Sequence, residues 1–590
     1  MEQIYTNRKE IMSNKRSKQT VCLLALVIIL FWGLRNIGNV QTITIIDDEF
    51  GYWGMGAQLA GLDWTSLLRE TYFYSYGYGL VVAPLIKLGV SLINVYRTMT
   101  VINTLLIVMD FAIAFYVLNK VTNAISVYLK GVIALFVTLT ANNVYMIDMG
   151  TPEVLLCSAY WLLFLAFFKI VYEERDVWLL GIPVITVFLY SLHNRSLGVV
   201  IIVGFFEIYY LIRNIKNKKK VILTIISILL LASLFFAEEL FRSYIVDNWY
   251  NSALTTSSSG KSATNNYSTT VGRISNLFSL KQIGFLILSV CGKIYSQVLS
   301  TYGLCLLPIV YVLVIGFGAI RKKHEITSID LLVIIITLGF LAEIGITSIF
   351  YQGTPRNITA GRIIQGRYTE FAVGPYILLA FVLIIAKKLN KLMCSMITAI
   401  ATVVIAITAF EIEYAYNDEL MGYNNAGLIE WFELFPVNRI GIIVAGIVAT
   451  IIGLLLILLL LKKVDMAIIG GLTLMIIVTA LLSSKNVEGY LIYKNEKISR
   501  YLKDVIEYTE NTNSMGKIYY LKTDTDNISE LEYIKLYQFI YPQKEIEVIY
   551  DEKVIDEGII CMSSSEENME YYRDKMKFIL NSERLLVFEK

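Results

Sequence analysis

Apolar stretches of roughly 17–22 residues recur along the chain and are separated by shorter polar segments. Each is long enough to cross a hydrocarbon core of about 30 Å as a helix that rises 1.5 Å per residue. The pattern predicts an α-helical polytopic membrane protein with about thirteen spans. We expect them near 21–38, 97–118, 129–147, 153–171, 177–192, 197–213, 221–240, 303–320, 329–350, 372–387, 392–410, 439–461 and 466–483.

The connections between the predicted spans alternate in charge. Every second connection is short, and most of these are basic, as in 213–220 and 387–391. Because basic loops stay in the cytoplasm, we expect a cytoplasmic N-terminus and long polar segments on the outer face of the cytoplasmic membrane. The outward segments are 39–79, 241–281, 351–371, 411–438 and the tail. Two short apolar segments, 80–95 and 282–300, are expected to be interfacial or re-entrant helices on that face.

The tail changes from long apolar runs to short alternating ones. Strand-like segments begin near residues 517, 545, 557 and 583, with helical segments between them and a helix at 496–511. The chain therefore divides into a transmembrane domain, 1–483, and a small extracytoplasmic α/β domain, 484–590. We expect the second to be structural or to face the acceptor.

Composition agrees with this division. The chain is 56% hydrophobic and 17% charged, with a mean hydropathy of +0.60, whereas a soluble protein carries about a quarter charged residues. The net charge of +2 gives no reason to expect a nucleic-acid partner.

Carboxylates gather at two outward turns. Asp47, Asp48 and Glu49 follow the first span, and Asp148 and Glu153 flank a proline at the start of the fourth. Such acids are often a solvated loop start or a favourable charge at a helix N-terminus. The residues after Glu49, "FGYWGMG", are aromatic and small, which indicates a packed surface and favours a functional site.

Basic side chains also lie on the outer face, against the usual bias. His193 and Arg195 stand at the outward end of the fifth span, and Arg356, Arg362 and Arg367 lie in the segment 351–371. Guanidinium groups form paired hydrogen bonds to phosphate oxygens better than lysine does, although outward arginines also bind lipid head groups.

These motifs resemble the GT-C superfamily of polytopic glycosyltransferases, in particular the branch of protein O-mannosyltransferases and the lipid A aminoarabinose transferase. In that branch the first outer loop begins with an Asp-Glu pair and a Tyr three residues later, as in Asp48, Glu49 and Tyr52. "YMIDMGTPEVLL" is similar to its second outer turn, "HNRSLGVV" to its arginine-containing turn, and "QGRYTEFAVGPY" to its Gly-Arg-Tyr segment.

The resemblance implies transfer of a sugar from a polyprenyl-phosphate donor to a hydroxyl of an envelope acceptor, with inversion. The implied catalytic residues are Asp48 as the general base, Glu49 and Glu153. The implied phosphate ligands are Arg367, Arg195 and Arg362, and the implied acceptor or sugar pocket contains Tyr52, Tyr368, Asp148 and His193. Asp47 extends the usual pair, so the base is Asp47 or Asp48, and metal dependence stays open.

Other functions fit parts of the pattern. A lipid-linked sugar flippase or transporter would use ionisable residues within the spans, such as Asp110 and Glu343. A polysaccharide polymerase or oligosaccharide transferase would share the location with a longer donor, and a non-catalytic assembly protein would use the tail for binding.

Overall fold

The computed structural model describes residues 2–250, 279–320, 326–350, 359–415, 422–511, 517–522, 531–554 and 557–590. Arg356, most of the outer segment 241–281 and the side chain of Asp47 lie outside the described residues.

Ten helices in the described part are long and apolar enough to cross a membrane, so the prediction of a polytopic helical protein is confirmed. They are α1 (Glu2–Leu34), α5 (Leu92–Val121), α8 (Glu153–Val171), α10 (Leu197–Arg213), α11 (Lys218–Trp249), α13 (Leu280–Ser300), α15 (Ser328–Phe350), α18 (Lys391–Tyr414), α20 (Arg439–Leu461) and α21 (Asp465–Asn511). Shorter apolar helices are α4 (Gly77–Lys87), α6 (Val127–Thr138), α9 (Gly181–Leu192), α14 (Leu306–Ile320) and α17 (Val373–Ile385).

The number of spans stays a prediction. Four of the expected spans, at 129–147, 177–192, 303–320 and 372–387, correspond to the shorter helices α6, α9, α14 and α17. Conversely α13, expected at the interface, has the length and apolarity of a span and packs against α15, α18 and α20. The segment 80–95 forms most of α4, which packs on α2, and the first turn of α5.

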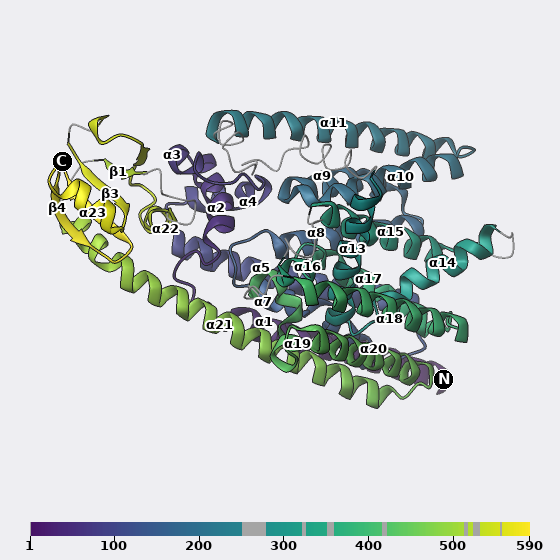
Figure 1. Cartoon of the computed structure of the whole chain (residues 1–590). Coiled ribbons are helices and arrows are strands. Elements are labelled where there is room, and N and C mark those ends of the chain that lie inside the picture. The colour runs from purple at the N-terminus through teal and green to yellow at the C-terminus, as the bar shows by residue number, and fades with distance from the viewer. Residues whose placement is uncertain are drawn as a thin grey trace.

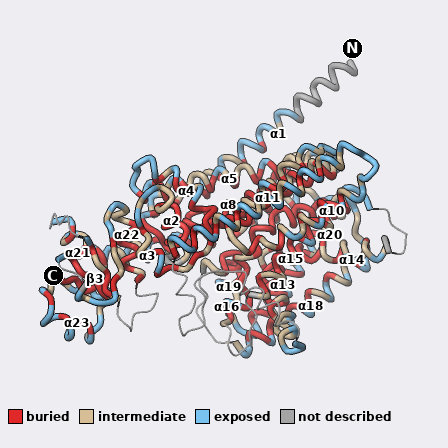
Figure 2. The backbone as a smooth tube through the Cα atoms, turned by 90° about the horizontal axis from the view of Figure 1, so that it is seen from above, coloured by how far each residue is buried: buried red, intermediate tan, exposed pale blue. Residues whose placement is uncertain are grey.

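The helices lie side by side along the long direction of the molecule (Figure 1). Helix α8 is central, because 83% of the residues in its most apolar stretch are buried. Helix α11 is peripheral, because only 17% of the residues in the corresponding stretch are buried. Large apolar side chains on α11, such as Leu229 and Phe236, are exposed, as expected for a surface that faces lipid. Figure 2 shows buried segments concentrated in the centre and exposed segments at the edges.

Short helices connect the spans at the end of the bundle that faces the C-terminal domain. They are α2 (Ile46–Ala60), α3 (Thr65–Leu68), α7 (Ala141–Met146), α16 (Ala360–Ile363), α19 (Ile429–Leu434) and the 3₁₀ turns η2 (Asn194–Ser196), η5 (Glu370–Ala372) and η6 (Gly422–Leu428). Every candidate site residue of the sequence analysis that the structure describes lies on or beside these short helices and the adjoining ends of the spans.

The C-terminal part forms a five-stranded sheet in the order β2-β1-β3-β5-β4. Its elements are β1 (Ile518–Leu521), α22 (Glu532–Ile540), β2 (Ile546–Ile549), β3 (Ile559–Ser563), α23 (Glu566–Arg573), β4 (Lys577–Asn581) and β5 (Leu585–Glu589). Strand β1 is parallel to β2 and β3, and β5 is antiparallel to β3 and β4. Four strands and both helices were predicted; β4 was wrongly included in the last helix.

The domain boundary predicted at residue 484 lies inside α21, which continues without a break to Asn511 (Figure 1), so the boundary stays a prediction. The two faces of the sheet also differ. Ile518, Tyr520 and Ile546 belong to the same continuous apolar core as the helical bundle. Ile560 and Phe588 belong to a separate cluster on the other side.

Candidate functional site

Two carboxylates and two guanidinium groups form a continuous chain of ion pairs. Arg367 donates from Nε to Glu153 Oε1 at 2.7 Å and from Nη1 to Asp48 Oδ2 at 2.8 Å. Arg195 donates from Nη2 to the other oxygen of Glu153. The order is therefore Asp48, Arg367, Glu153, Arg195, and four segments that are far apart in sequence meet here.

Helix ends bring the four residues together. Asp48 lies in the first turn of α2, Glu153 is the first residue of α8, and Arg195 lies in η2 directly before α10. Arg367 precedes η5 and α17, and its backbone N–H donates to the carbonyl of Asn424 at 3.4 Å. The N-terminal position of Glu153 also suits its negative charge.

Burial differs along the chain of ion pairs. The side chains of Glu153, Arg195 and Arg367 are 2%, 3% and 2% exposed, whereas that of Asp48 is 21% exposed. Asp48 is therefore the member of the chain of ion pairs that is most accessible to solvent. The four charges sum to zero, which is how a buried site avoids the cost of an unpaired ion.

Aromatic rings border the two arginines. The guanidinium carbon of Arg195 lies 4.8 Å from the ring centre of Tyr368, and that of Arg367 lies 5.5 Å from that of Tyr423. The rings of His193 and Tyr368 are 5.9 Å apart. Because the positive groups face aromatic rings as well as carboxylates, their positions are fixed on more than one side.

The electrostatics of the site follow from these contacts. Although burial disfavours its charge, the carboxylates of Glu153 and Asp48 raise the pKa of Arg367 above its ordinary value. Burial lowers the pKa of His193 well below its ordinary value, and Arg195 adds to this effect, so the imidazole is neutral at pH 7. Burial and then Asp48 raise the pKa of Tyr52, which keeps its hydroxyl protonated.

Glu49 lies in a different environment from its neighbour Asp48. Its carboxylate is fully buried and accepts hydrogen bonds from Thr44 N–H at 2.5 Å, Tyr96 Oη at 2.9 Å and Gly150 N–H at 2.9 Å. Burial raises the pKa of Glu49, although these donors act against the shift. Glu49 thus joins α2, α5 and the turn before Glu153, and it makes no direct contact with the arginines among the interactions described.

The turn before Glu153 needs a glycine at position 150. A Cβ on Gly150 would lie 2.7 Å from the ring of Tyr96 and even closer to Trp53 Nε1. The indole of Trp53 donates to the carbonyl of Gly150 at 3.1 Å, so the close approach forms a hydrogen bond. We call Glu49, Trp53, Tyr96 and Gly150 the turn-holding group.

Two other candidates lie apart from the ion pairs. Asp148 accepts from Asn36 Nδ2 at 2.9 Å, and burial raises its pKa to about 7. The side chain of Arg362 is exposed, and its carbonyl accepts from Lys293 Nζ at 2.6 Å. Of the candidates predicted from sequence, the structure therefore brings together Asp48, Glu153, Arg195, Arg367, Tyr52, Tyr368 and His193.

Sequence reasoning missed Glu370, which lies three residues after Arg367. The residue is 7% exposed, and its two carboxyl oxygens are buried without a hydrogen-bond partner among the described residues. A Cβ on Gly366 would lie 2.6 Å from one of its oxygens, so glycine leaves room for the carboxyl there. Burial and then Glu153 raise the pKa of Glu370 to about 8, which makes it neutral at pH 7. The acid in the motif "QGRYTEF" is the feature of the sequence that could have indicated Glu370.

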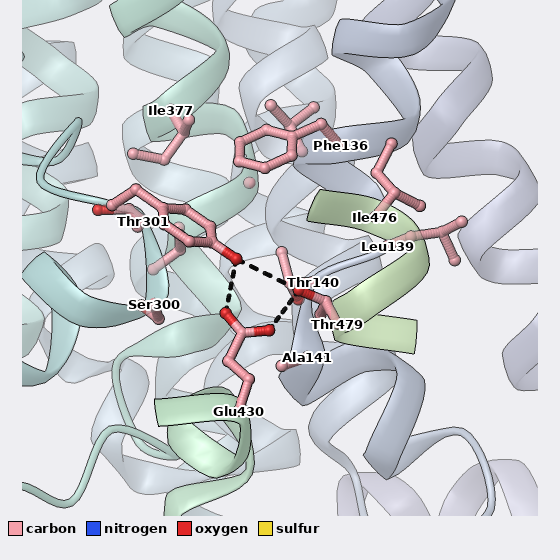
Figure 3. A pocket seen from close by; sticks show the side chains of 14 residues that line it. Phe136, Leu139, Thr140, Ala141, Ser300, Thr301, Ile377, Glu430, Ile476 and Thr479 are labelled. Atoms are coloured by element: carbon pink, nitrogen blue, oxygen red, sulfur yellow. Dashed lines mark hydrogen bonds between the residues drawn. The ribbon is translucent and has the colours of Figure 1, made fainter. Parts of the chain in front are cut away.

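A cavity lies between α6, α17, α19 and α21 (Figure 3). Phe136, Ile377 and Ile476 supply apolar walls, and Tyr302 and Thr479 each donate to one oxygen of Glu430. Because both oxygens of Glu430 are paired within the protein, this acid has a structural role in the cavity. In the described part of the chain, no three or more His, Cys, Asp or Glu side chains gather in a group suited to a metal ion.

Comparison with known proteins gives similarity in structure only. No family model matches the chain, and no curated protein matches its sequence. The crystal structures of ArnT from Cupriavidus metallidurans, one bound to undecaprenyl phosphate and one in the apo state, each match over 96% of this chain and 97% of that chain, with 11% identity and a TM-score of 0.48.

A cryo-EM structure of the arabinosyltransferase EmbB from Mycobacterium smegmatis matches over 80% of this chain and 41% of that chain, with 12% identity and a TM-score of 0.41. ArnT and EmbB are members of the GT-C superfamily. These similarities concern the fold alone.

Proposed function

We propose that this protein is a membrane glycosyltransferase that transfers a sugar from a polyprenyl-phosphate donor to an acceptor hydroxyl. The observation that carries the proposal is the chain of ion pairs at the ends of helices, with two buried arginines and one partly exposed carboxylate. Arginine pairs bind phosphate oxygens, and a carboxylate beside them can accept a proton from a hydroxyl. The outer-loop motifs support the same assignment.

In this proposal Arg367 and Arg195 bind the donor phosphate. In the free protein Arg367 is occupied by Asp48 and Glu153, and the four charges balance. A phosphate that takes the Nη1–H of Arg367 releases Asp48 from its pair. Donor binding therefore frees the base at the moment when the anomeric carbon arrives beside it.

The reaction is a single displacement. The acceptor oxygen forms a bond to the anomeric carbon, and its proton passes to Asp48. The bond between the anomeric carbon and the phosphate oxygen breaks, and the electron pair leaves on the phosphate, where the two guanidinium groups stabilise the added charge in a poorly solvated site. Attack opposite to the leaving group inverts the anomeric configuration.

Neighbouring groups position the sugar. Tyr52, Tyr368 and neutral His193 offer aromatic faces and hydrogen-bonding groups around the arginines. A lipid-linked donor stays in the bilayer, which accounts for a transferase built into spanning helices. From the basic loops we place the site and the C-terminal domain on the outer face of the cytoplasmic membrane; a reporter fused after Lys590 that is active only inside the cell would contradict this side.

The test uses the full-length protein in lipid vesicles. Polyprenyl-phosphate donors that carry ¹³C-labelled hexoses or pentoses are added, with an envelope extract from cells that lack the protein as the acceptor. Mass spectrometry should show label in an envelope product together with free polyprenyl phosphate. Arg367→Ala is the matched inactive control.

Two outcomes would contradict the proposal. Movement of labelled donor across the vesicle membrane without transfer would identify a flippase. Transfer of preassembled oligosaccharides but not of single sugars would identify a polymerase or oligosaccharide transferase.

A further inference from the structure

The C-terminal domain contacts the groups that hold the site. Phe539 of α22 is fully buried, and its ring meets Trp53 edge-on at 5.4 Å between centroids and Tyr96 at 6.3 Å. Trp53 and Tyr96 are stacked nearly parallel, at 5.2 Å and 6°. The Phe539 ring therefore contacts both aromatic rings of the turn-holding group.

Those two rings act on the acids through hydrogen bonds. Tyr96 Oη donates to Glu49, and the Trp53 indole donates to Gly150. Glu49 is adjacent to Asp48, and Gly150 is three residues before Glu153. Asp48 is thus next to a residue that Tyr96 holds, and Glu153 follows closely after a residue that Trp53 holds. Phe539 contacts both of these aromatic rings.

Further contacts fix the domain against the first outer loop. Trp64 Nε1 donates to the carbonyl of Pro542 at 3.0 Å, and the Val548 N–H donates to Ser66 Oγ at 2.7 Å. Lys522 Nζ pairs with Glu70 at 2.5 Å, in a largely buried position. Because these contacts lie on several elements, α22 has one fixed position over α2.

We infer that the C-terminal domain positions the carboxylates of the transferase site, with Phe539 as the positioning residue. The inference rests on the proposed function. Phe539 touches no reacting group; it holds Trp53 and Tyr96, which hold Glu49 and Gly150, which set the positions of Asp48 and Glu153. A misplacement of about 1 Å at a reacting group is enough to cost on the order of a hundredfold in rate.

The test compares two phenylalanines of the same domain. Phe539 belongs to the core shared with the bundle, whereas Phe588 is equally buried but belongs to the separate cluster on the far face of the sheet. Phe539→Leu and Phe588→Leu remove the same atoms. Phe539→Met has about the same volume as the leucine variant, but its flexible thioether makes a favourable contact with aromatic rings, so it is the conservative variant.

The readout that does not depend on activity is hydrogen–deuterium exchange of the full-length protein. Phe539→Leu should speed exchange in 44–50 and 148–153, and Phe588→Leu only in the strands of the sheet. In the transfer assay, Phe539→Leu should lower kcat by about tenfold or more with little change in the KM for the donor. Phe539→Met should restore most of kcat, and Phe588→Leu should stay near the wild type.

The outcomes separate the two proposals. Unchanged exchange in 148–153 for Phe539→Leu, or equal losses of kcat in both leucine variants, would overturn the positioning role. Faster exchange at these segments in a protein that transfers no sugar from any polyprenyl phosphate would support the positioning of the turn and sink the proposed function instead.

Discussion

Asp48 and Glu49 are neighbours in sequence, yet they belong to two different regions of the molecule. Asp48 is partly exposed and pairs with Arg367, whereas Glu49 is fully buried and accepts hydrogen bonds from three elements. Successive residues on a helix point about 100° apart, so one acid faces the arginines and the other faces the interior. An acidic pair can therefore combine a reacting group with the group that fixes its position.

The strongest test of the different roles of Asp48 and Glu49 is to neutralise each acid in turn. Asp48→Asn keeps the shape and an acceptor oxygen for Arg367 but removes the proton acceptor, so kcat should fall by about 10²–10⁴. Thermal stability should fall only modestly, because Arg367 keeps Glu153 as a charged partner. Glu49→Gln replaces an acceptor oxygen by an N–H₂ group that faces donors, which should lower the free energy of unfolding by about 1–3 kcal/mol. Transfer rates and melting curves in detergent measure both. A wild-type kcat for Asp48→Asn would show that Asp48 is not the general base.

The next test changes the basic partner of Asp48. Arg367→Lys keeps the charge but loses the paired donors, so donor affinity should fall by roughly tenfold, or about 1.4 kcal/mol. Arg439 is an exposed arginine at the start of α20 that pairs with Glu413 at 2.9 Å, and Arg439→Lys should have no effect. Titration with labelled polyprenyl phosphate measures the affinity; equal values for both variants would exclude Arg367 as the phosphate ligand.

The smallest expected effect concerns Asp148, which is buried like Glu49 but has fewer donors. Its folded-state pKa of about 7 lies above the unfolded value of about 3.9. Between these values only the unfolded chain releases the proton, so the free energy of unfolding decreases as pH rises, and the loss is complete above about pH 7. Asp148→Asn should therefore raise the melting temperature by about 2 °C at pH 8 and by less at pH 5. A larger gain at pH 5 would contradict this.

Much of the fold could be predicted because span length and loop charge are local properties of the sequence. Helix α13 was expected at the interface because Lys293 interrupts its apolar run. In the structure this lysine is buried and donates to the carbonyl of Arg362, a partner that sequence cannot show. Strand β4 was missed because "KFILN" follows a helical segment directly, and its partner is β5, which comes later.

For the site, charged residues at expected helix ends, together with the GT-C resemblance, placed Asp48, Glu153, Arg195 and Arg367 in one group with other candidates such as Arg362. The groups that hold them could not be found in this way. Tyr96 and Phe539 are aromatic residues in ordinary apolar patterns, and their contacts join positions separated by 47 to hundreds of residues. Only the tertiary structure brings them together.

The unbroken helix α21 connects the apolar bundle directly to the C-terminal sheet. Its 47 residues form a rod of about 70 Å, with one end at Asp465 beside the bundle and the other at Asn511 under the sheet. Over that length each degree of tilt moves the far end by about 1 Å. Helices tilt as the hydrocarbon thickness changes. A tilt of α21 within a membrane would therefore produce its largest displacement at Asn511, next to the sheet that carries the contact between Phe539 and Trp53.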